Sequence, residues 1–327
     1  MRGQVYFGLF FKRVEKMFSV DVIIPTYKPG AEFIKLLDML EKQLYAPKHI
    51  IILNTEKKYF DDFLSEHPGF EEKYSNVIIK HVTKEEFNHG GTRNVGVSLS
   101  DTDLFLMMTQ DAIPKDSMLI TNLVKAFEDE QVVASYARQY PRPECNLTER
   151  YNRKFNYPAE SLKKTQADVS KLGIKTYFCS NVCAMYRREV FDKLGGFIDK
   201  TIFNEDMIYA GSALQCGYAV FYAADAAVVH SHNYTCMQQF HRNFDLGVSQ
   251  IDHPEIFAGL KSESEGIVMV KRSISHFAHI GKHYLIPSYV LSCGARWLGY
   301  KLGRSYKKLP KWFIGMCTMN KTYWQQI

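Results

Sequence analysis

The chain has 327 residues, of which 46% are hydrophobic, 23% are charged and 14% are aromatic. This composition is typical of a folded globular protein and excludes a disordered or fibrous chain. The length allows one large domain, or one and a half, with an ample core. No stretch reaches the about 18 apolar residues that a membrane-spanning helix needs.

The charge is unevenly distributed along the chain. The formal net charge is +6, but residues 266–327 contain ten Lys or Arg and no Asp or Glu, which leaves the preceding residues net negative. Aromatic and aliphatic side chains are interleaved with these cations. This pattern favours an anionic bilayer surface over nucleic acid as the partner. The alternative is an ordinary helical subdomain with a solvated basic face.

Strand and helix patterns alternate through the first part of the chain. Residues 1–17 have a short apolar core between charges and no cleavage site, so we interpret them as an N-terminal extension. Strands are expected at 20–25, 49–53, 76–82, 103–108 and 132–136, with helices at 32–44, from 61, from 92 to 100 and at 117–130. This alternation predicts an α/β fold with a mixed, mostly parallel sheet flanked by helices.

The second part of the chain has a less regular pattern. Residues 137–175 are polar and contain Pro, and we expect a long excursion or lid there. A strand is expected within 176–186, short helices at 187–194 and 205–215, and two strands at 218–222 and 227–230. The seven cysteines form no Cys-x-x-Cys pair, which indicates reduced thiols in a cytoplasmic protein.

Polar clusters follow several of the expected strands. Ligands bind α/β sheets beyond the carboxyl ends of the strands, so these clusters predict one site built from several loops. They are Pro25-Thr26-Tyr27, Asn54-Thr55-Glu56, His89-Gly90-Gly91 and Gln110-Asp111. The glycine pair indicates a tight turn into a helix whose N-terminus suits an anion. A solvated turn with a helix cap is the alternative.

Three groups of side chains are candidates for chemistry. Asp111 follows an apolar strand and could bind Mg²⁺ or Mn²⁺, or it could simply form a turn before Pro114. The pair Glu205-Asp206 opens a helix and could supply a general base or only a cap. His230 and His232 close a strand, and we expect at most one of them to join Asp111.

The sequence disfavours several other classes of enzyme. The sequence contains no P-loop and no G-x-G-x-x-G after the first strand, which disfavours kinases and dehydrogenases. No Ser-His-Asp or Cys-His arrangement stands out either.

The motifs together resemble family 2 glycosyltransferases of GT-A fold. VDVIIPTYKP, FNHGGTRNVG, TQDAIP, CSNVCAMYRREVFDKLGGF, FNEDM and VVHSHNY occur in the order seen in that family. The F-x-H-G-G-T-R-N form resembles bacterial rhamnosyltransferases that use dTDP-L-rhamnose. The match covers roughly residues 18–315. It implies a GT-A domain over 18–265 and a basic, amphipathic helical C-terminal region over 266–327.

The resemblance implies an inverting transfer and a role for each matching residue. Asp206, with Glu205 beside it, would be the catalytic base, and Ser180 and Asn181 would lie near the sugar or acceptor. A divalent metal, Mg²⁺ or Mn²⁺, would be bound by Asp111 with His230 or His232. The donor would contact Pro25, Thr26, Tyr27, Asn54, Glu56, His89, Gly90, Gly91, Arg93, Asn94, Gln110 and Asp111.

The resemblance also implies partners and a location. It suggests a dTDP-sugar donor, a lipid-diphosphate-linked saccharide acceptor and an anionic membrane surface, but no nucleic acid. The C-terminal helices could also form a homodimer. The protein would be cytoplasmic and peripheral to the inner face of the cell membrane.

The sequence departs from the family pattern at two positions. Asn54 stands where an Asp often reads the nucleotide base, and Gln110 replaces an acid of the D-x-D motif. Three alternatives therefore stay open. They are the same fold with another donor such as a UDP-hexose, a catalytically silent sugar-nucleotide-binding module, and a sugar-1-phosphate nucleotidyltransferase. The last would carry a glycine-rich segment after the first strand, where PTYKPG stands instead.

Overall fold

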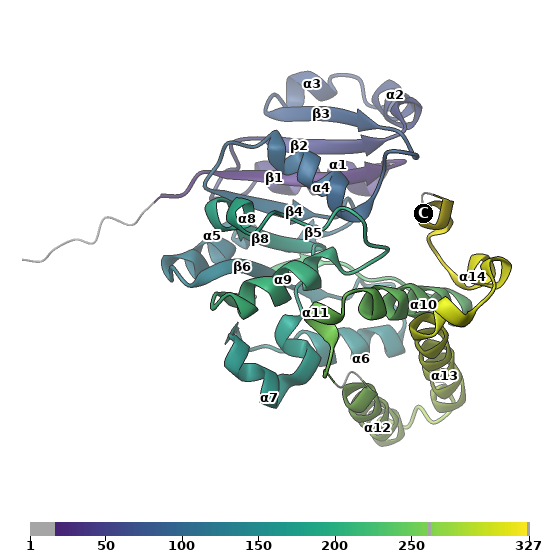
Figure 1. The fold of residues 1–327 in the computed structure, drawn as a ribbon. Coiled ribbons are helices and arrows are strands. Elements are labelled where there is room, and N and C mark those ends of the chain that lie inside the picture. Colours follow the sequence, from purple (N-terminus) through teal and green to yellow (C-terminus); the bar gives the residue numbers. More distant parts are fainter. Residues whose placement is uncertain (1–16, 261–262, 326–327) are drawn as a thin grey trace, which may run out of the picture.

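A nine-stranded mixed sheet forms the centre of the computed structural model, which describes residues 17–260 and 263–325 (Figure 1). Its first half is parallel and has the strand order β3-β2-β1-β4. In its second half β8 is antiparallel to both β4 and β6, and β6 is parallel to β9. The strands are β1 (Val20–Tyr27), β2 (Ile50–Thr55), β3 (Val77–Val82), β4 (Leu104–Met108), β5 (Ile113–Pro114), β6 (Val132–Tyr140), β7 (Leu162–Lys164), β8 (Cys183–Arg187) and β9 (Ala219–Val229).

Helices cover both faces of this sheet. The expected α/β class, a mostly parallel sheet with flanking helices, is confirmed. The helices are α1 (Ala31–Glu41), α2 (Lys57–Glu66), α3 (Phe70–Lys73), α4 (His89–Ser98), α5 (Leu119–Val124), α6 (Leu147–Asn156), α7 (Val169–Leu172), α8 (Arg188–Lys193), α9 (Glu205–Gln215), α10 (Cys236–Asp252), α11 (Pro254–Phe257), α12 (Glu263–His279), α13 (Leu285–Arg304), α14 (Lys311–Cys317) and α15 (Lys321–Gln325). Short 3₁₀ turns lie at Lys125–Glu128, Gln166–Asp168, Gly173–Tyr177 and Tyr306–Lys308.

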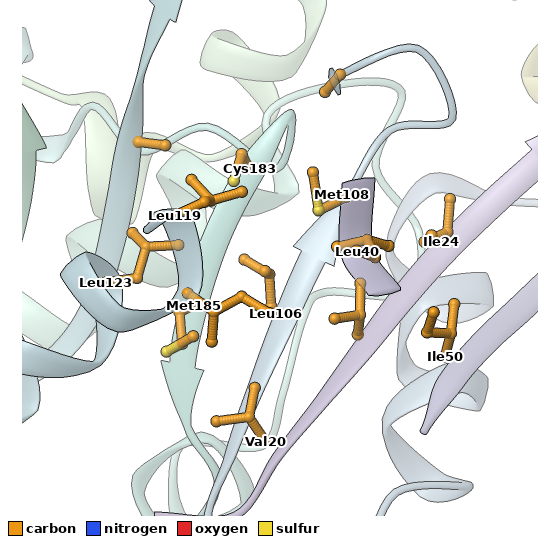
Figure 2. Close-up of a cluster of buried hydrophobic side chains, with 14 of the residues drawn as sticks. Val20, Ile24, Leu40, Ile50, Leu106, Met108, Leu119, Leu123, Cys183 and Met185 are labelled. Carbon is orange, nitrogen blue, oxygen red and sulfur yellow. The ribbon is translucent and has the colours of Figure 1, made fainter. Parts of the chain in front are cut away.

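The core explains why the central strands read as unbroken apolar runs. Successive residues of a strand face opposite sides of a sheet, and here both sides are covered. Ile24 and Ile50 pack on one side with Leu106, in the cluster drawn in Figure 2. Ile23 and Ile51 pack on the other side, under α4. The carboxyl ends of β1 and β4 are therefore held rigidly at one edge.

Some elements differ from the sequence-based expectation. Residues 137–175 are not a long irregular excursion, because β6 continues to Tyr140 and is followed by α6, β7 and α7. The two strands expected at 218–222 and 227–230 are one strand, β9, which a register shift opposite Ala137 and Arg138 allows to bend. The residues at this bend, between Ala223 and Ala227, were therefore predicted to be a loop between two strands.

The C-terminal helices pack on the rest of the protein through glycines. A Cβ atom added to Gly299 would lie 2.2 Å from the carbonyl oxygen of Phe240, and one added to Gly303 would lie 2.0 Å from that of Phe244. From the other side, a Cβ on Gly247 would lie 2.5 Å from the Tyr300 oxygen. Helices α10 and α13 therefore touch backbone to backbone. Among the described residues, none of the helices combines the length and apolarity needed to cross a bilayer.

Candidate active site

A cavity of about 1190 Å³ opens where β4, β6 and β9 end. These three strands run in the same direction, so their carboxyl ends meet at one edge of the sheet. The segment 109–111 follows β4, Gln139 lies near the end of β6, and 230–232 follows β9. Residues 180–182 before β8 and 203–206 at the start of α9 complete this part of the wall.

Asp111, His230 and His232 form a compact cluster in this cavity. Their ligand atoms all lie within 4.8 Å of one another. The Nε2 atom of His230 is 3.5 Å from Asp111 Oδ2, and that of His232 is 3.4 Å from the same oxygen. The expectation that at most one histidine joins Asp111 was wrong, because residues two apart along a strand lie on the same face, as the two rings do here.

Gln139 determines which nitrogen of His230 faces Asp111. The Oε1 atom of Gln139 accepts hydrogen bonds from Arg153 and from His230 Nδ1, the latter at 3.1 Å, while its Nε2 donates to Ser180 Oγ at 3.1 Å. A guanidinium only donates, so the amide atom beside Arg153 must be the oxygen. The proton of His230 therefore lies on Nδ1, and the Nε2 lone pair points to the Asp111 carboxylate.

This arrangement fits a divalent cation. Two acceptors that face each other without a proton between them attract a positive ion, and a second contact on the far ring nitrogen is typical of metal-binding histidines. Burial lowers the pKa of His230 to about 3 and also lowers the pKa of His232. Both rings are therefore neutral near pH 7, the form that binds metals.

Glu205 and Asp206 share the cavity wall but have different environments. Burial disfavours the charge of Glu205, but the Arg93 guanidinium at 3.2 Å and the Asn181 amide at 3.1 Å outweigh it and hold its pKa below the usual value. Burial together with the charge of Glu205 raises the pKa of the half-buried Asp206 to about 7. Two adjacent carboxyls with separated pKa values are typical of acid–base catalysis.

The start of α9 holds this acid pair in place. Asn204 adopts a left-handed conformation, with φ 69° and ψ 24°, which Asn tolerates better than most residues. Its side chain donates to Ser249 Oγ at 3.3 Å. The backbone N–H groups of Asn181 and Met207 donate to the two oxygens of Asp206 at 2.9 and 2.8 Å. The carboxylate is thus fixed on the cavity wall.

Comparison with known proteins decides the family. Residues 21–195 match the model "Glycosyl transferase family 2". The O-antigen chain rhamnosyltransferase RfbN of Salmonella typhimurium is 39% identical over 313 residues, which cover 94% of this chain and 97% of RfbN. WbaN of Salmonella anatum, with the same description, is 39% identical over 94% of this chain and 96% of its own. This chain belongs to glycosyltransferase family 2.

Solved structures support the fold of this glycosyltransferase. The mannosyltransferase PcManGT from Pyrobaculum calidifontis, in complex with GDP-Man and Mn²⁺, has a TM-score of 0.54 at 16% identity, covering 95% of this chain and 86% of PcManGT. TarS 1–349 of S. aureus in complex with UDP has a TM-score of 0.50 at 15% identity and covers 89% and 91%. At these identities the likeness concerns the GT-A architecture alone.

The cavity of the glycosyltransferase brings together about half of the residues that the sequence singled out. Those that line it are His89, Arg93, Gln110, Asp111, Ser180, Asn181, Glu205, Asp206, His230 and His232. Those outside its lining are Pro25, Thr26, Tyr27, Asn54, Glu56, Gly90, Gly91 and Asn94.

The two glycines of the motif pack against other parts of the protein and do not line the cavity. Helix α4 begins at His89, so both glycines belong to its first turn and do not form a turn before it. A Cβ atom on Gly90 would lie 1.8 Å from the carbonyl oxygen of Ile198. Asn94 binds the same segment, donating to the Phe197 oxygen at 2.7 Å. These residues position His89 and Arg93, the two members of the motif that line the cavity.

The ends of β1 and β2 form a separate edge beside the cavity. The Gln110 amide exchanges hydrogen bonds with the Tyr27 backbone at 2.8 and 3.0 Å, which ties β1 to the segment after β4. Tyr27 is 38% exposed, and its ring packs edge-on against Tyr59 at 5.4 Å. Asn54, by contrast, has no exposed surface, and its side chain donates to the Glu56 carbonyl at 3.1 Å.

Sequence reasoning missed several residues of the cavity. Gln139 and Arg153 lie in the stretch that was expected to be an excursion or lid. Extending the strand expected at 132–136 by a few residues would have placed Gln139 at its carboxyl end. Arg242 of α10 also lines the cavity, with its guanidinium 4.5 Å from the centre of the Phe203 ring. No local signal distinguishes that arginine from others on a helix.

Proposed function

We propose that this glycosyltransferase transfers L-rhamnose from dTDP-L-rhamnose, with inversion, to a hydroxyl of a lipid-diphosphate-linked glycan during assembly of a cell-surface polysaccharide. The observation that carries the proposal is 39% identity over 94% of the chain to two proteins that are both named O-antigen chain rhamnosyltransferases. Both are covered almost completely, so the likeness includes the C-terminal helices as well as the catalytic domain.

Asp206 is the base in this proposal. As the bond to the anomeric carbon forms, its carboxylate takes the proton of the acceptor hydroxyl. A base with a pKa of about 7 is ionised to a large extent at neutral pH and still accepts a proton readily. Glu205 stays ionised because Arg93 pairs with it, and its charge is one cause of the raised pKa of Asp206.

The donor lies between the exposed edge and the cavity in this proposal. Tyr27 and Lys28 at the end of β1 and Tyr59 at the start of α2 offer rings for the base and a cation for the phosphates. The Lys28 ammonium lies 4.7 Å from the Tyr59 ring centre. Asp111, His230 and His232 would bind a divalent metal, with Arg242 facing the same space. Such a metal would stabilise the negative charge of the departing diphosphate.

A thermal-shift titration tests the donor and the metal together. The protein is melted with dTDP, UDP or GDP, each with no metal, with Mg²⁺ or with Mn²⁺. We expect dTDP with Mn²⁺ to stabilise the protein most, by about 2.7 kcal/mol at a hundredfold excess over Kd. Mn²⁺ is expected to exceed Mg²⁺, because imidazole ligands suit transition metals while Mg²⁺ prefers oxygen.

Asp111→Asn is the matched variant for this titration. It should remove the increment that the metal adds to the dTDP shift and leave the metal-free shift intact. An equal increment in the variant would contradict the proposed metal site. A shift with UDP alone would overturn the dTDP donor, and no shift with any nucleotide would contradict a nucleotide-sugar donor of any kind.

The membrane contact is proposed from the C-terminal helices. Trp297, Trp312 and Met316 are 56%, 69% and 64% exposed, and Lys308 and Lys311 are exposed close by in sequence. Large exposed apolar side chains among cations are typical of proteins that bind the interface of anionic bilayers.

Vesicle sedimentation tests the membrane contact. Lys308→Glu/Lys311→Glu is expected to reduce binding to phosphatidylglycerol vesicles by about tenfold or more, since each basic residue near such a surface contributes about 1 kcal/mol and reversal repels. Lys42→Glu/Lys58→Glu changes the net charge equally at exposed sites just after α1 and on α2 and should have little effect. An equal loss of vesicle binding in both variants would show that binding depends on the net charge of the protein and not on the C-terminal helices.

A further inference from the structure

The three proposed metal ligands come from two separate segments of the chain. Asp111 follows β4, and His230 and His232 follow β9. The pairing of β5 with β9 covers only Ile113 and Pro114, so all three ligands lie beyond that ladder. Further contacts are therefore needed to hold the two segments in register with each other.

Arg142, in the loop after β6, contacts both segments. Its backbone N–H donates to Ser231 Oγ, between the two histidines, at 3.0 Å. Its guanidinium Nη2 donates to the backbone carbonyl of Asp111 at 2.9 Å, and Nη1 donates to Glu32 Oε2 at 3.0 Å. Because a guanidinium is planar, contacts through both terminal nitrogens fix its orientation. The Arg142 side chain is 20% exposed, so water has little access to the contact with Asp111.

Glu32 connects this bridge to the edge proposed for the donor. It lies in the first turn of α1, shortly after Tyr27. The Gln110 amide already ties the Tyr27 backbone to the residues after β4. Through Gln110 and Arg142, the Asp111 segment is thus linked at two points to the chain between Tyr27 and Glu32.

We propose that Arg142 is a positioning residue of the metal site, which holds the Asp111 backbone beside the segment of the two histidines so that the three ligands bind one divalent cation together. The inference rests on the proposed function, which assigns the metal to these ligands. Arg142 acts through its hydrogen bond to the Asp111 carbonyl and supplies no ligand atom itself.

The charge of Arg142 predicts the opposite effect on metal binding to that of its position. A guanidinium repels a nearby cation, so loss of the charge alone would tighten metal binding. Loss of the hydrogen bond to Asp111 should weaken it, because removing a residue that orients metal ligands typically costs about 10–100-fold in affinity. The direction of the change therefore separates positioning from electrostatics.

Titration of the full chain with Mn²⁺ alone, followed by electron paramagnetic resonance of the free ion, tests the inference. Arg142→Met is expected to weaken Mn²⁺ binding by about tenfold or more. Arg142→Lys keeps the charge but lacks the planar pair of donors, so it should also bind Mn²⁺ more weakly. Lys35→Met removes the other cation that contacts Glu32, at 2.7 Å, and should leave the affinity unchanged. The metal-free dTDP shift should persist in all three variants.

Unchanged or tighter Mn²⁺ binding in Arg142→Met would overturn the inference, as would full affinity in Arg142→Lys or an equal loss in Lys35→Met. Loss of the metal-free dTDP shift in Arg142→Met would also overturn it, because the substitution would then disturb more than the metal site. Asp111→Asn separates these results from a failure of the proposed function. If it binds Mn²⁺ as tightly as the unmodified protein, or if the unmodified protein binds none, the metal site itself is wrong and the inference falls with it.

Discussion

Asp206→Asn is expected to lower kcat for transfer by about 10²–10⁴-fold, the range that a positioned general base contributes. Asn has nearly the same shape but can keep only one of the two hydrogen bonds from the Asn181 and Met207 backbone N–H groups, because its NH₂ group cannot accept. It cannot take the proton of the acceptor. Nucleotide binding should persist, so the dTDP thermal shift serves as the control. Near-normal turnover in this variant would rule out Asp206 as the base.

The pH dependence of the same pair adds a second test. Because the pKa of Asp206 is raised to about 7, kcat/KM of the unmodified enzyme should fall as the pH drops below about 7. The pH dependence of stability has the opposite sign to that of an acid in a salt bridge. Ionisation is harder in the folded state than in the unfolded state, so stability is lost as pH rises from about 4 towards 7. Above that range Asp206→Asn should unfold no more easily than the unmodified protein.

Arg93→Met is expected to cost about 3–5 kcal/mol of the free energy of unfolding, measured by urea denaturation at pH 7.5. The Arg93 and Glu205 side chains are only 9% and 7% exposed, so removing the guanidinium leaves a buried carboxylate without its counter-ion. It also removes the hydrogen bond from Arg93 Nη1 to the His89 carbonyl at 2.7 Å.

The double variant Arg93→Met/Glu205→Gln separates charge from packing. If the loss comes from an uncompensated buried charge, making Glu205 neutral should recover most of it, and the two substitutions will be strongly non-additive. Additive costs would show that Arg93 acts through shape alone. If Arg93→Met alone lowers the free energy of unfolding by less than about 1 kcal/mol, the Glu205 carboxylate must become hydrated or protonated when Arg93 is absent.

The parallel half of the fold was largely readable from the sequence. Buried parallel strands leave continuous apolar runs such as that of β4, and the polar residues just after them mark the ligand edge. Asp111, Asp206 and His230 were found in this way, because each directly follows or opens a regular element. Their order along the chain then matched the family.

The remaining parts of the site depend on contacts between distant residues. Gln139 and Arg153 can be identified as site residues only after β6 and α6 bring them together with His230. Whether Gly90 faces a ligand or Ile198 depends on a contact more than a hundred residues away. Both histidines face Asp111, as residues two apart along a strand do, so this pairing could have been predicted from the sequence.

The backbone contact between α10 and α13 sets the distance between the cavity and the exposed side chains of α13. Gln239 and Arg242 of α10 line the cavity, while Trp297 of α13 is exposed on the helix that packs against α10. Because Gly299 and Gly303 bring the two helix backbones into direct contact, we expect α13 and the cavity wall to move together. An enzyme resting on a bilayer through α13 and α14 would therefore hold its reacting centre at one height. We expect such an enzyme to select acceptors by how far their growing end projects from the lipid, in addition to the identity of the terminal sugar.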